Sequence, residues 1–234
     1  MVLPTLKVER LYRQISNLLI SCIKNGQFAA GQLLPSEREL AKQLGVSRSS
    51  IREALIALEI TGWVEIRTGN GIYVNDPLPD VPGAALPEDE FSLRAFIQAR
   101  QVYESMMAEL AAVHATDEQR AALSELAQAL SQLHVNDAQF LHEDKRFHLL
   151  ISEMSGNEVL QDMMEYLWNK RQSSRFMRLE TLYADPDIPH IMNQDHTEIA
   201  AAILARDPAR ARQSMMQHLQ HVYDHLFSDD DAAN

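Results

Sequence analysis

Asp144, His148, His196 and His218 are side chains whose types and spacing suit a bound metal ion. Asp144 and His148 are four residues apart, so on a helix they project from one face with an offset of about 40°. His196 and His218 lie among apolar residues in two further segments with helical periodicity. One carboxylate and three imidazoles drawn from three helices would form a facial metal site that keeps open positions for a ligand.

Spacing alone leaves other histidines open as ligands. His225 falls on nearly the same helix face as His218, and His142 precedes Asp144 by two residues. The chain has nine histidines, and a surface position or a satisfied place in the core is the alternative for each.

The segments that must position these side chains are helical. From residue 91 onward apolar residues recur at helical spacing, glycine is scarce and no strand-like alternation occurs. The predicted helices lie near 91–114, 117–134, 137–155, 157–182, 190–205 and 207–227. This pattern predicts an all-α antiparallel helical bundle.

The N-terminal third of the chain has the pattern of a helix-turn-helix. Ser36 and Glu39 form a capping box, Gly45 supplies a tight turn, and Ser47 can cap the helix that follows. A helix that backs the motif is predicted by apolar residues at helical spacing: Leu11, Ile15, Leu18, Leu19 and Ile23. The second helix of the motif carries an apolar stripe of Ile51, Ala54, Leu55 and Leu58.

Arginines and a hairpin follow at the places where a DNA-binding domain needs them. Arg48 and Arg52 lie one turn apart in the first turns of the second helix, which suits reading of the major groove. Two strand-like segments, 62–67 and 72–74, flank the glycine-rich turn at 68–71 and predict a wing. The motif therefore predicts a winged helix that binds DNA, with a protein-interaction scaffold as the alternative.

Composition fits a two-domain protein of mainly α fold. The 234 residues carry a net charge of −12, but residues 1–76 contain nine Lys/Arg and seven Asp/Glu, whereas residues 77–234 contain twelve and twenty-six. Contact with phosphate is therefore expected on the N-terminal domain alone, although plain solubility also explains the acidic excess. The sequence has a single cysteine and no apolar run of about 20 residues, so a cytoplasmic protein without a membrane span is expected.

A proline-rich, acidic segment divides the chain. We predict a winged helix-turn-helix domain at 1–76, a linker at 77–90, a helical effector, metal-binding and dimerisation domain at 91–228, and a disordered tail at 229–234.

Residues 10–76 resemble the DNA-binding domain of the GntR family of bacterial transcription regulators. The stretches that carry the resemblance are 34–41 (LPSERELA), Ser47-Arg48, 51–55 (IREAL) and Gly69-Asn70-Gly71. The resemblance implies that Arg38, Arg48 and Arg52 meet the operator and that the wing tip at Gly69 enters the minor groove. Ser47 and Ser49, at the start of the same helix, are further candidates for DNA contact.

Residues 91–227 resemble the helical effector domain, the FCD domain, of the FadR branch of that family. The stretches that carry this resemblance are Arg100 with Glu104, 144–148, 155–157, His196 and 211–219. Many members of the branch bind a divalent metal through one Asp and three His. The resemblance places these ligands at Asp144, His148, His196 and His218, and favours zinc, with nickel and manganese as the other candidates.

The same resemblance implies a site for a small organic acid. In similar proteins an arginine at the place of Arg100 holds the acid together with the metal, whereas the alternative for Arg100 is an ion pair with Glu104. Asn157, Trp168 and Arg171 are further candidates for effector binding. For Asn157 the residue chemistry favours a cap of the next helix, and for Arg171 the alternative is a solvated basic face.

The chain most resembles the hexuronate-type regulators of the branch, through residues 98–101 with Glu104, through Trp168 and through the sequence that ends at Leu219. The function expected from the resemblance is that of a homodimeric transcription repressor of sugar-acid catabolism. It would bind double-stranded operator DNA and respond to a hexuronate or aldonate effector.

Two alternatives remain at this point. A metal-dependent hydrolase or isomerase would use the same four ligands with an activated water, and folding would have to bring Glu143 or Glu153 beside them as a base. An architectural DNA-binding protein would keep the metal for structure alone. The winged helix on the same chain favours a regulator over an enzyme.

Overall fold

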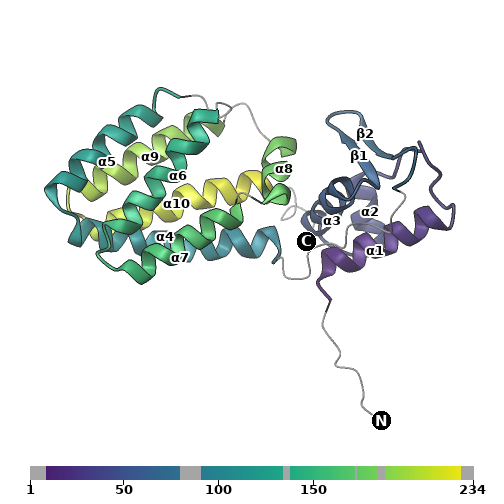
Figure 1. Ribbon diagram of the computed structural model, residues 1–234, viewed down its shortest axis with the longest axis horizontal. Helices are drawn as coiled ribbons and strands as arrows, with labels where there is room; N and C mark the ends of the chain where they lie inside the picture. Colours follow the sequence, from purple (N-terminus) through teal and green to yellow (C-terminus); the bar gives the residue numbers. More distant parts are fainter. Residues whose placement is uncertain (1–8, 80–90, 134–137, 172, 184–187, 228–234) are drawn as a thin grey trace, which may run out of the picture. The chain divides into compact units, whose positions relative to one another are not determined.

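The computed structural model describes residues 9–79, 91–133, 138–171, 173–183 and 188–227 (Figure 1). These residues form two compact units. The first contains the chain up to Leu93 together with Ser174–Leu182, and the second contains Arg94–Ser173 and Tyr183–Ser228. Most of the predicted linker and the whole predicted tail, 229–234, lie outside the described residues.

The first unit contains the predicted winged helix. Its elements are α1 (Leu11–Lys24), α2 (Glu37–Leu44), α3 (Arg48–Ile60), β1 (Val64–Arg67) and β2 (Gly71–Val74). The Ser36 hydroxyl accepts from the Glu39 backbone N–H, and the Glu39 side chain accepts from the Ser36 N–H, which completes the capping box of α2. Gly45 ends α2 at a φ of 65°, a left-handed conformation that glycine adopts without strain.

Helix α3 forms the centre of the first core. Its predicted apolar stripe, Ile51, Ala54, Leu55 and Leu58, is fully buried, and α1 packs against it. The predicted helix is present as α1, but Leu11 and Leu18 of its apolar series are each 46% exposed. Ser16 is buried instead, because its hydroxyl donates to the carbonyl of Ala54 and so joins α1 to α3.

The wing is a two-stranded antiparallel hairpin. Val64 pairs with Val74 and Arg67 pairs with Gly71, so the turn contains residues 68–70. Gly69 has a φ of 75°, which a residue with a β-carbon rarely adopts, and its position is exposed. The strands and the glycine turn agree with the sequence prediction.

The second unit is the predicted helical bundle. Its elements are α4 (Leu93–His114), α5 (Asp117–Leu130), α6 (Ala138–Glu153), α7 (Glu158–Arg171), α9 (Ile188–Leu204) and α10 (Pro208–Phe227). Helix α9 packs along α10, α5 packs against α6 and α9, and α6 packs against α7 (Figure 1). Among the described residues, no helix is both long and apolar enough to cross a membrane.

One predicted helix, 157–182, is wrong because the structure divides it into α7 and α8 (Ser174–Tyr183). The backbone N–H of Ser173 donates to the carbonyl of Lys170, an i to i−3 bond that tightens and ends the last turn of α7. Serine competes with the helix for backbone hydrogen bonds, so the serines at 173 and 174 favour a break.

Helix α8 belongs to the first unit, although the sequence assigned it to the second domain. Arg178 forms a bidentate ion pair with Glu59 at the end of α3, with Nε–Oε2 and Nη2–Oε1 distances of 2.6 and 2.7 Å. Arg175 Nη2 lies 3.3 Å from Glu53 Oε2, and both side chains are buried. The basic residues of this segment are therefore paired, not a solvated face.

Candidate metal centre and DNA-binding surface

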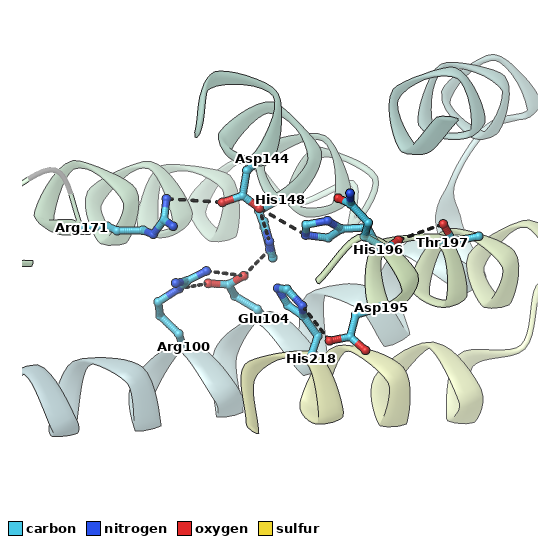
Figure 2. Close-up of polar contacts among 10 residues, drawn as sticks. Arg100, Glu104, Asp144, His148, Arg171, Asp195, His196, Thr197 and His218 are labelled. Carbon is cyan, nitrogen blue, oxygen red and sulfur yellow. Dashed lines mark hydrogen bonds and ion pairs between the residues drawn. The ribbon is translucent and has the colours of Figure 1, made fainter. Parts of the chain in front are cut away.

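Three helices of the bundle bring the four predicted ligands together (Figure 2). Asp144 and His148 come from α6, His196 from α9 and His218 from α10, and each is at most 1% exposed. The three histidines each offer a ring nitrogen within 4.8 Å of the others. Asp144 Oδ1 lies 3.5 Å from His148 Nε2 and 3.2 Å from His196 Nε2. We call these four residues the metal cluster.

The metal cluster fits a divalent metal ion. Metal–ligand bonds of about 2.0–2.2 Å separate neighbouring ligand atoms by about 3.0–3.5 Å, the spacing found around Asp144 Oδ1. Asp144 Oδ1, His148 Nε2 and both ring nitrogens of His196 are buried without a hydrogen bond of good geometry. Orphaned polar atoms at this depth are costly, and a shared cation would satisfy them.

The pKa shifts of Asp144 and His218 suit metal binding. Burial raises the pKa of Asp144, but His148, His196 and the Arg171 guanidinium lower it more, so that it lies well below its usual value. Burial lowers the pKa of His218 to about 4, although a hydrogen bond with Asp195 opposes this shift. A carboxylate and a neutral imidazole are the forms that coordinate a metal.

Two carboxylates outside the cluster contact its histidines. Glu104 Oε2 lies 2.5 Å from His148 Nδ1, and Asp195 Oδ2 lies 3.4 Å from His218 Nδ1. These contacts leave Nε2 of each ring for a metal. Sequence reasoning considered Glu104 only as a partner of Arg100 and missed Asp195. The place of Asp195 directly before His196 was the available signal.

Three of the predicted effector residues surround the same cluster. Arg171 Nη1 lies 3.3 Å from Asp144 Oδ2, and Arg100 Nε donates to Glu104 Oε1 at 2.5 Å. The guanidinium carbons of Arg100 and Arg171 lie 5.1 and 4.6 Å from the ring centroid of Trp168. The Trp168 indole N–H is buried and has no acceptor among the described residues.

Asn157, the fourth predicted effector residue, makes the contacts of a helix cap. Its side chain is exposed, and its Oδ1 accepts from the backbone N–H groups of Val159 and Leu160 at 3.0 and 3.3 Å. These are the contacts of a cap for α7, the alternative that the sequence offered. We therefore leave Asn157 out of the proposed effector site.

Other histidines and acids considered from the sequence are placed elsewhere. His142 is exposed on α6. Glu143 pairs with Arg146 at 2.6 Å, and Glu153 contacts Gln119 at 3.4 Å. Glu143 and Glu153 are thus engaged with other partners, so the arrangement offers no support for a catalytic base.

The candidate DNA-binding residues lie on α2, on the start of α3 and on the wing. Arg38 and Gly69 are exposed, and the Arg48 side chain is 28% exposed with Nη2 3.9 Å from Glu37 Oε2. The Ser47 hydroxyl caps α3 by accepting from the backbone N–H of Ser50 at 3.2 Å. Ser47 remains exposed.

Arg52 and Ser49 are placed differently from the other candidates. Arg52 is 5% exposed, and its Nε donates to Glu37 Oε2 at 2.9 Å. Ser49 is 3% exposed, and its hydroxyl lies 3.0 Å from that of Ser47. Arg52 thus holds the carboxylate that also approaches Arg48, and it is buried, whereas a side chain that contacts DNA must be exposed.

Comparison with known proteins matches this division of the chain. Residues 11–74 match the family described as bacterial regulatory proteins, gntR family, and residues 95–221 match the FCD domain. Over 231 residues the chain is 35% identical to the Uxu operon regulator of Haemophilus influenzae, covering 94% of this chain and 83% of that protein. Over 225 residues it is 32% identical to the Exu regulon transcriptional regulator of Escherichia coli K12, covering 94% and 86%.

A solved structure has the same fold. The structure described as E. coli McbR/YncC aligns with a TM-score of 0.52 and 22% identity, covering 95% of this chain and 99% of that one. The FCD match spans more than half of the chain, and both regulators are matched over most of their length. The protein is a transcription regulator and not an enzyme: it belongs to the gntR family of bacterial regulators and, by its FCD domain, to the FadR branch of that family.

Proposed function

We propose that this regulator is a homodimeric repressor of sugar-acid catabolism, whose operator binding is controlled by a hexuronate or aldonate effector at a divalent metal site. The observation that carries the proposal is the buried metal cluster of one aspartate and three histidines, flanked by two guanidinium groups. Similarity to proteins named as Uxu and Exu regulators supports the choice of a hexuronate-type effector.

Zinc is the proposed metal, with nickel and manganese as the other candidates, because imidazole-rich sites accept several divalent ions. Asp144, His148, His196 and His218 would hold it. A bound metal would supply a Lewis-acidic position for a carboxylate or hydroxyl oxygen. The repressor role, the control of sugar-acid genes and the cytoplasmic location are proposed from the resemblance. They do not follow from the geometry of the site.

The charges around the cluster favour an anionic effector. With neutral histidines, the guanidinium groups of Arg100 and Arg171 and the carboxylates of Glu104, Asp144 and Asp195 leave one negative charge. A divalent metal would turn this into one positive charge, which a single carboxylate would neutralise. The indole N–H of Trp168, which has no acceptor among the described residues, would donate to a further oxygen of such an acid.

Exposed apolar residues support a dimer through the bundle. Val102, Met106 and Val113 lie at helical spacing on α4 and are 67, 39 and 57% exposed. Helix α7 carries a second exposed series at helical spacing: Val159, Met163 and Tyr166 are 62, 49 and 57% exposed. The Tyr103 hydroxyl donates to the carbonyl of Leu160, so these helices are neighbours. A second copy of the chain covering both stripes would give the two-fold symmetry that a near-palindromic operator requires.

Helix α8 offers a route by which the effector could act on the DNA-binding domain, in addition to the linker. It follows α7, which ends at Arg171, and its residues Arg175 and Arg178 pair with Glu53 and Glu59 of α3. Glu59 Oε1 also accepts from the backbone N–H of Ile66 in β1 at 3.0 Å. A shift of α7 on effector binding would therefore move groups that support both the second DNA-binding helix and the wing.

A thermal-shift screen of uronic, aldonic and hydroxy acids tests the proposed effector. With zinc present, one acid class at about 100 times its Kd is expected to stabilise the bundle by about 2.7 kcal/mol, which raises Tm by roughly 5–10 °C. A neutral sugar of the same size, and each acid after removal of the metal by a chelator, serve as controls. Equal stabilisation with and without metal would contradict a metal-bound effector.

Arg178→Ala tests the α8 route. Removing the bidentate partner of Glu59 is expected to reduce the acid-dependent change in operator affinity, a coupling of about 1–3 kcal/mol in such systems, by about half or more. Fluorescence anisotropy of labelled operator DNA, with and without the acid, measures it. Arg146→Ala, which removes an equal charge from the exposed face of α6, should keep the full response. A full response in Arg178→Ala would exclude this route.

A further inference from the structure

We infer that Glu104 is a positioning residue for the metal: its carboxylate holds His148 with Nε2 directed to the metal position and is itself held by Arg100. The inference rests on the proposed metal and effector site and deepens it. It means that the arginine proposed to bind the acid also supports a metal ligand.

The Glu104 side chain contacts both Arg100 and His148 (Figure 2). Glu104 projects from α4 and is fully buried. Its Oε1 accepts from Arg100 Nε at 2.5 Å, and its Oε2 lies 2.5 Å from His148 Nδ1 and 3.5 Å from Arg100 Nη2. His148 Nε2, on the other side of the ring, lies 3.5 Å from Asp144 Oδ1. One oxygen therefore faces the histidine while the other faces the arginine.

Only a carboxylate satisfies both neighbours at this position. Arg100 can only donate, because its guanidinium stays protonated in proteins, and His148 must carry its proton on Nδ1 if its bare Nε2 is to bind a metal. A glutamine amide has one oxygen and one NH2 group. Its oxygen would face the charged guanidinium, because that hydrogen bond is the stronger one. The NH2 group would then face Nδ1 and favour the tautomer with the proton on Nε2, which cannot coordinate.

The positive charge of Arg100 stabilises the buried carboxylate of Glu104. An unpaired charge at full burial would be strongly disfavoured, and the guanidinium, 4% exposed, provides the opposite charge. Arg100 thus keeps Glu104 in the form that orients His148. An acid that engages Arg100 would act on the metal through this contact.

Metal affinity of Glu104→Gln tests the inference. Full-length protein stripped of metal is titrated with Zn²⁺ against a chromophoric chelator at pH 8.5, where protons compete little with the metal. Loss of an outer carboxylate that orients a ligand weakens metal binding by about 10–100-fold, and this is the expected effect. The visible absorption of the Co²⁺-loaded protein is expected to change as well, because it reports the ligand set. Glu109→Gln is the matched control, since Glu109 lies on the same helix and pairs with Arg212 near the surface.

Glu104→Asp is the second variant and keeps the test decisive if Glu104→Gln does not fold. It keeps the charge beside Arg100 but is shorter, so its Zn²⁺ affinity should lie between those of wild type and Glu104→Gln. Wild-type Zn²⁺ affinity and an unchanged Co²⁺ spectrum in a folded Glu104 variant would overturn the inference alone. A wild-type protein that binds no Zn²⁺, Ni²⁺ or Mn²⁺ would overturn the proposed metal site and the inference with it.

Discussion

The double variant His148→Ala/His196→Ala is expected to lose stoichiometric metal. Structural zinc sites bind with about 10–16 kcal/mol, so each of four protein ligands accounts for about 3 kcal/mol. Removing two imidazoles should therefore weaken binding by roughly 10⁴-fold. Elemental analysis of dialysed protein measures the metal content, and circular dichroism checks that the helices persist.

The matched control for that experiment is His142→Ala/His114→Ala. Both residues are exposed histidines of the same bundle, so their removal should leave the metal content unchanged. Metal that stays bound at one equivalent in His148→Ala/His196→Ala would show that the four-ligand assignment is wrong. The acid would then need another site as well.

Arg48→Ala is expected to weaken operator binding by about 1–3 kcal/mol, a loss of roughly 5–150-fold. Arg48 begins α3 and keeps part of its side chain exposed, as a group that contacts base edges or phosphate must. Fluorescence anisotropy with DNA selected by the wild-type protein measures the affinity. A titration in salt then separates the two roles, because loss of a phosphate contact reduces the salt slope by about one unit.

Two further variants are compared with Arg48→Ala: Arg146→Ala as a control of equal charge, and Arg52→Ala as a test of the support for Arg48. Arg146 is 60% exposed on α6, so its removal changes the net charge equally and should not change operator affinity. Arg52→Ala should weaken binding by an indirect route, since Glu37 would lose its buried partner and draw Arg48 toward itself. Unchanged operator affinity in Arg48→Ala would remove the proposed role of this helix.

Local signals determined the winged helix almost completely. The capping box at Ser36, the left-handed turn at Gly45 and the glycine turn at Gly69 act within a few residues of the chain. The apolar period of α3 likewise follows from its own sequence, and its stripe is buried as predicted. Leu11 and Leu18 belong to the apolar series of α1 but are exposed, because which face of α1 is buried depends on its partner α3, far away in the sequence.

For the candidate site, sequence supplied the residue types and the resemblance supplied the assignment. Asp144 and His148 are linked by helix spacing, but nothing local joins them to His196 and His218. Packing of α6, α9 and α10 decides that these side chains meet. Glu104 and Asp195 were missed as supports of the cluster for the same reason: their contacts with His148 and His218 connect different helices.

The sequence by itself determined the two folds, the turn and cap residues, and the residue types for a metal and an acid. Only the tertiary structure decided that Arg52 is held by Glu37 and that α8 joins the first unit. The physical reason is how far apart along the chain the interacting residues lie. Backbone conformation responds to neighbours along the chain, whereas burial and charge pairing depend on side chains that only folding brings together.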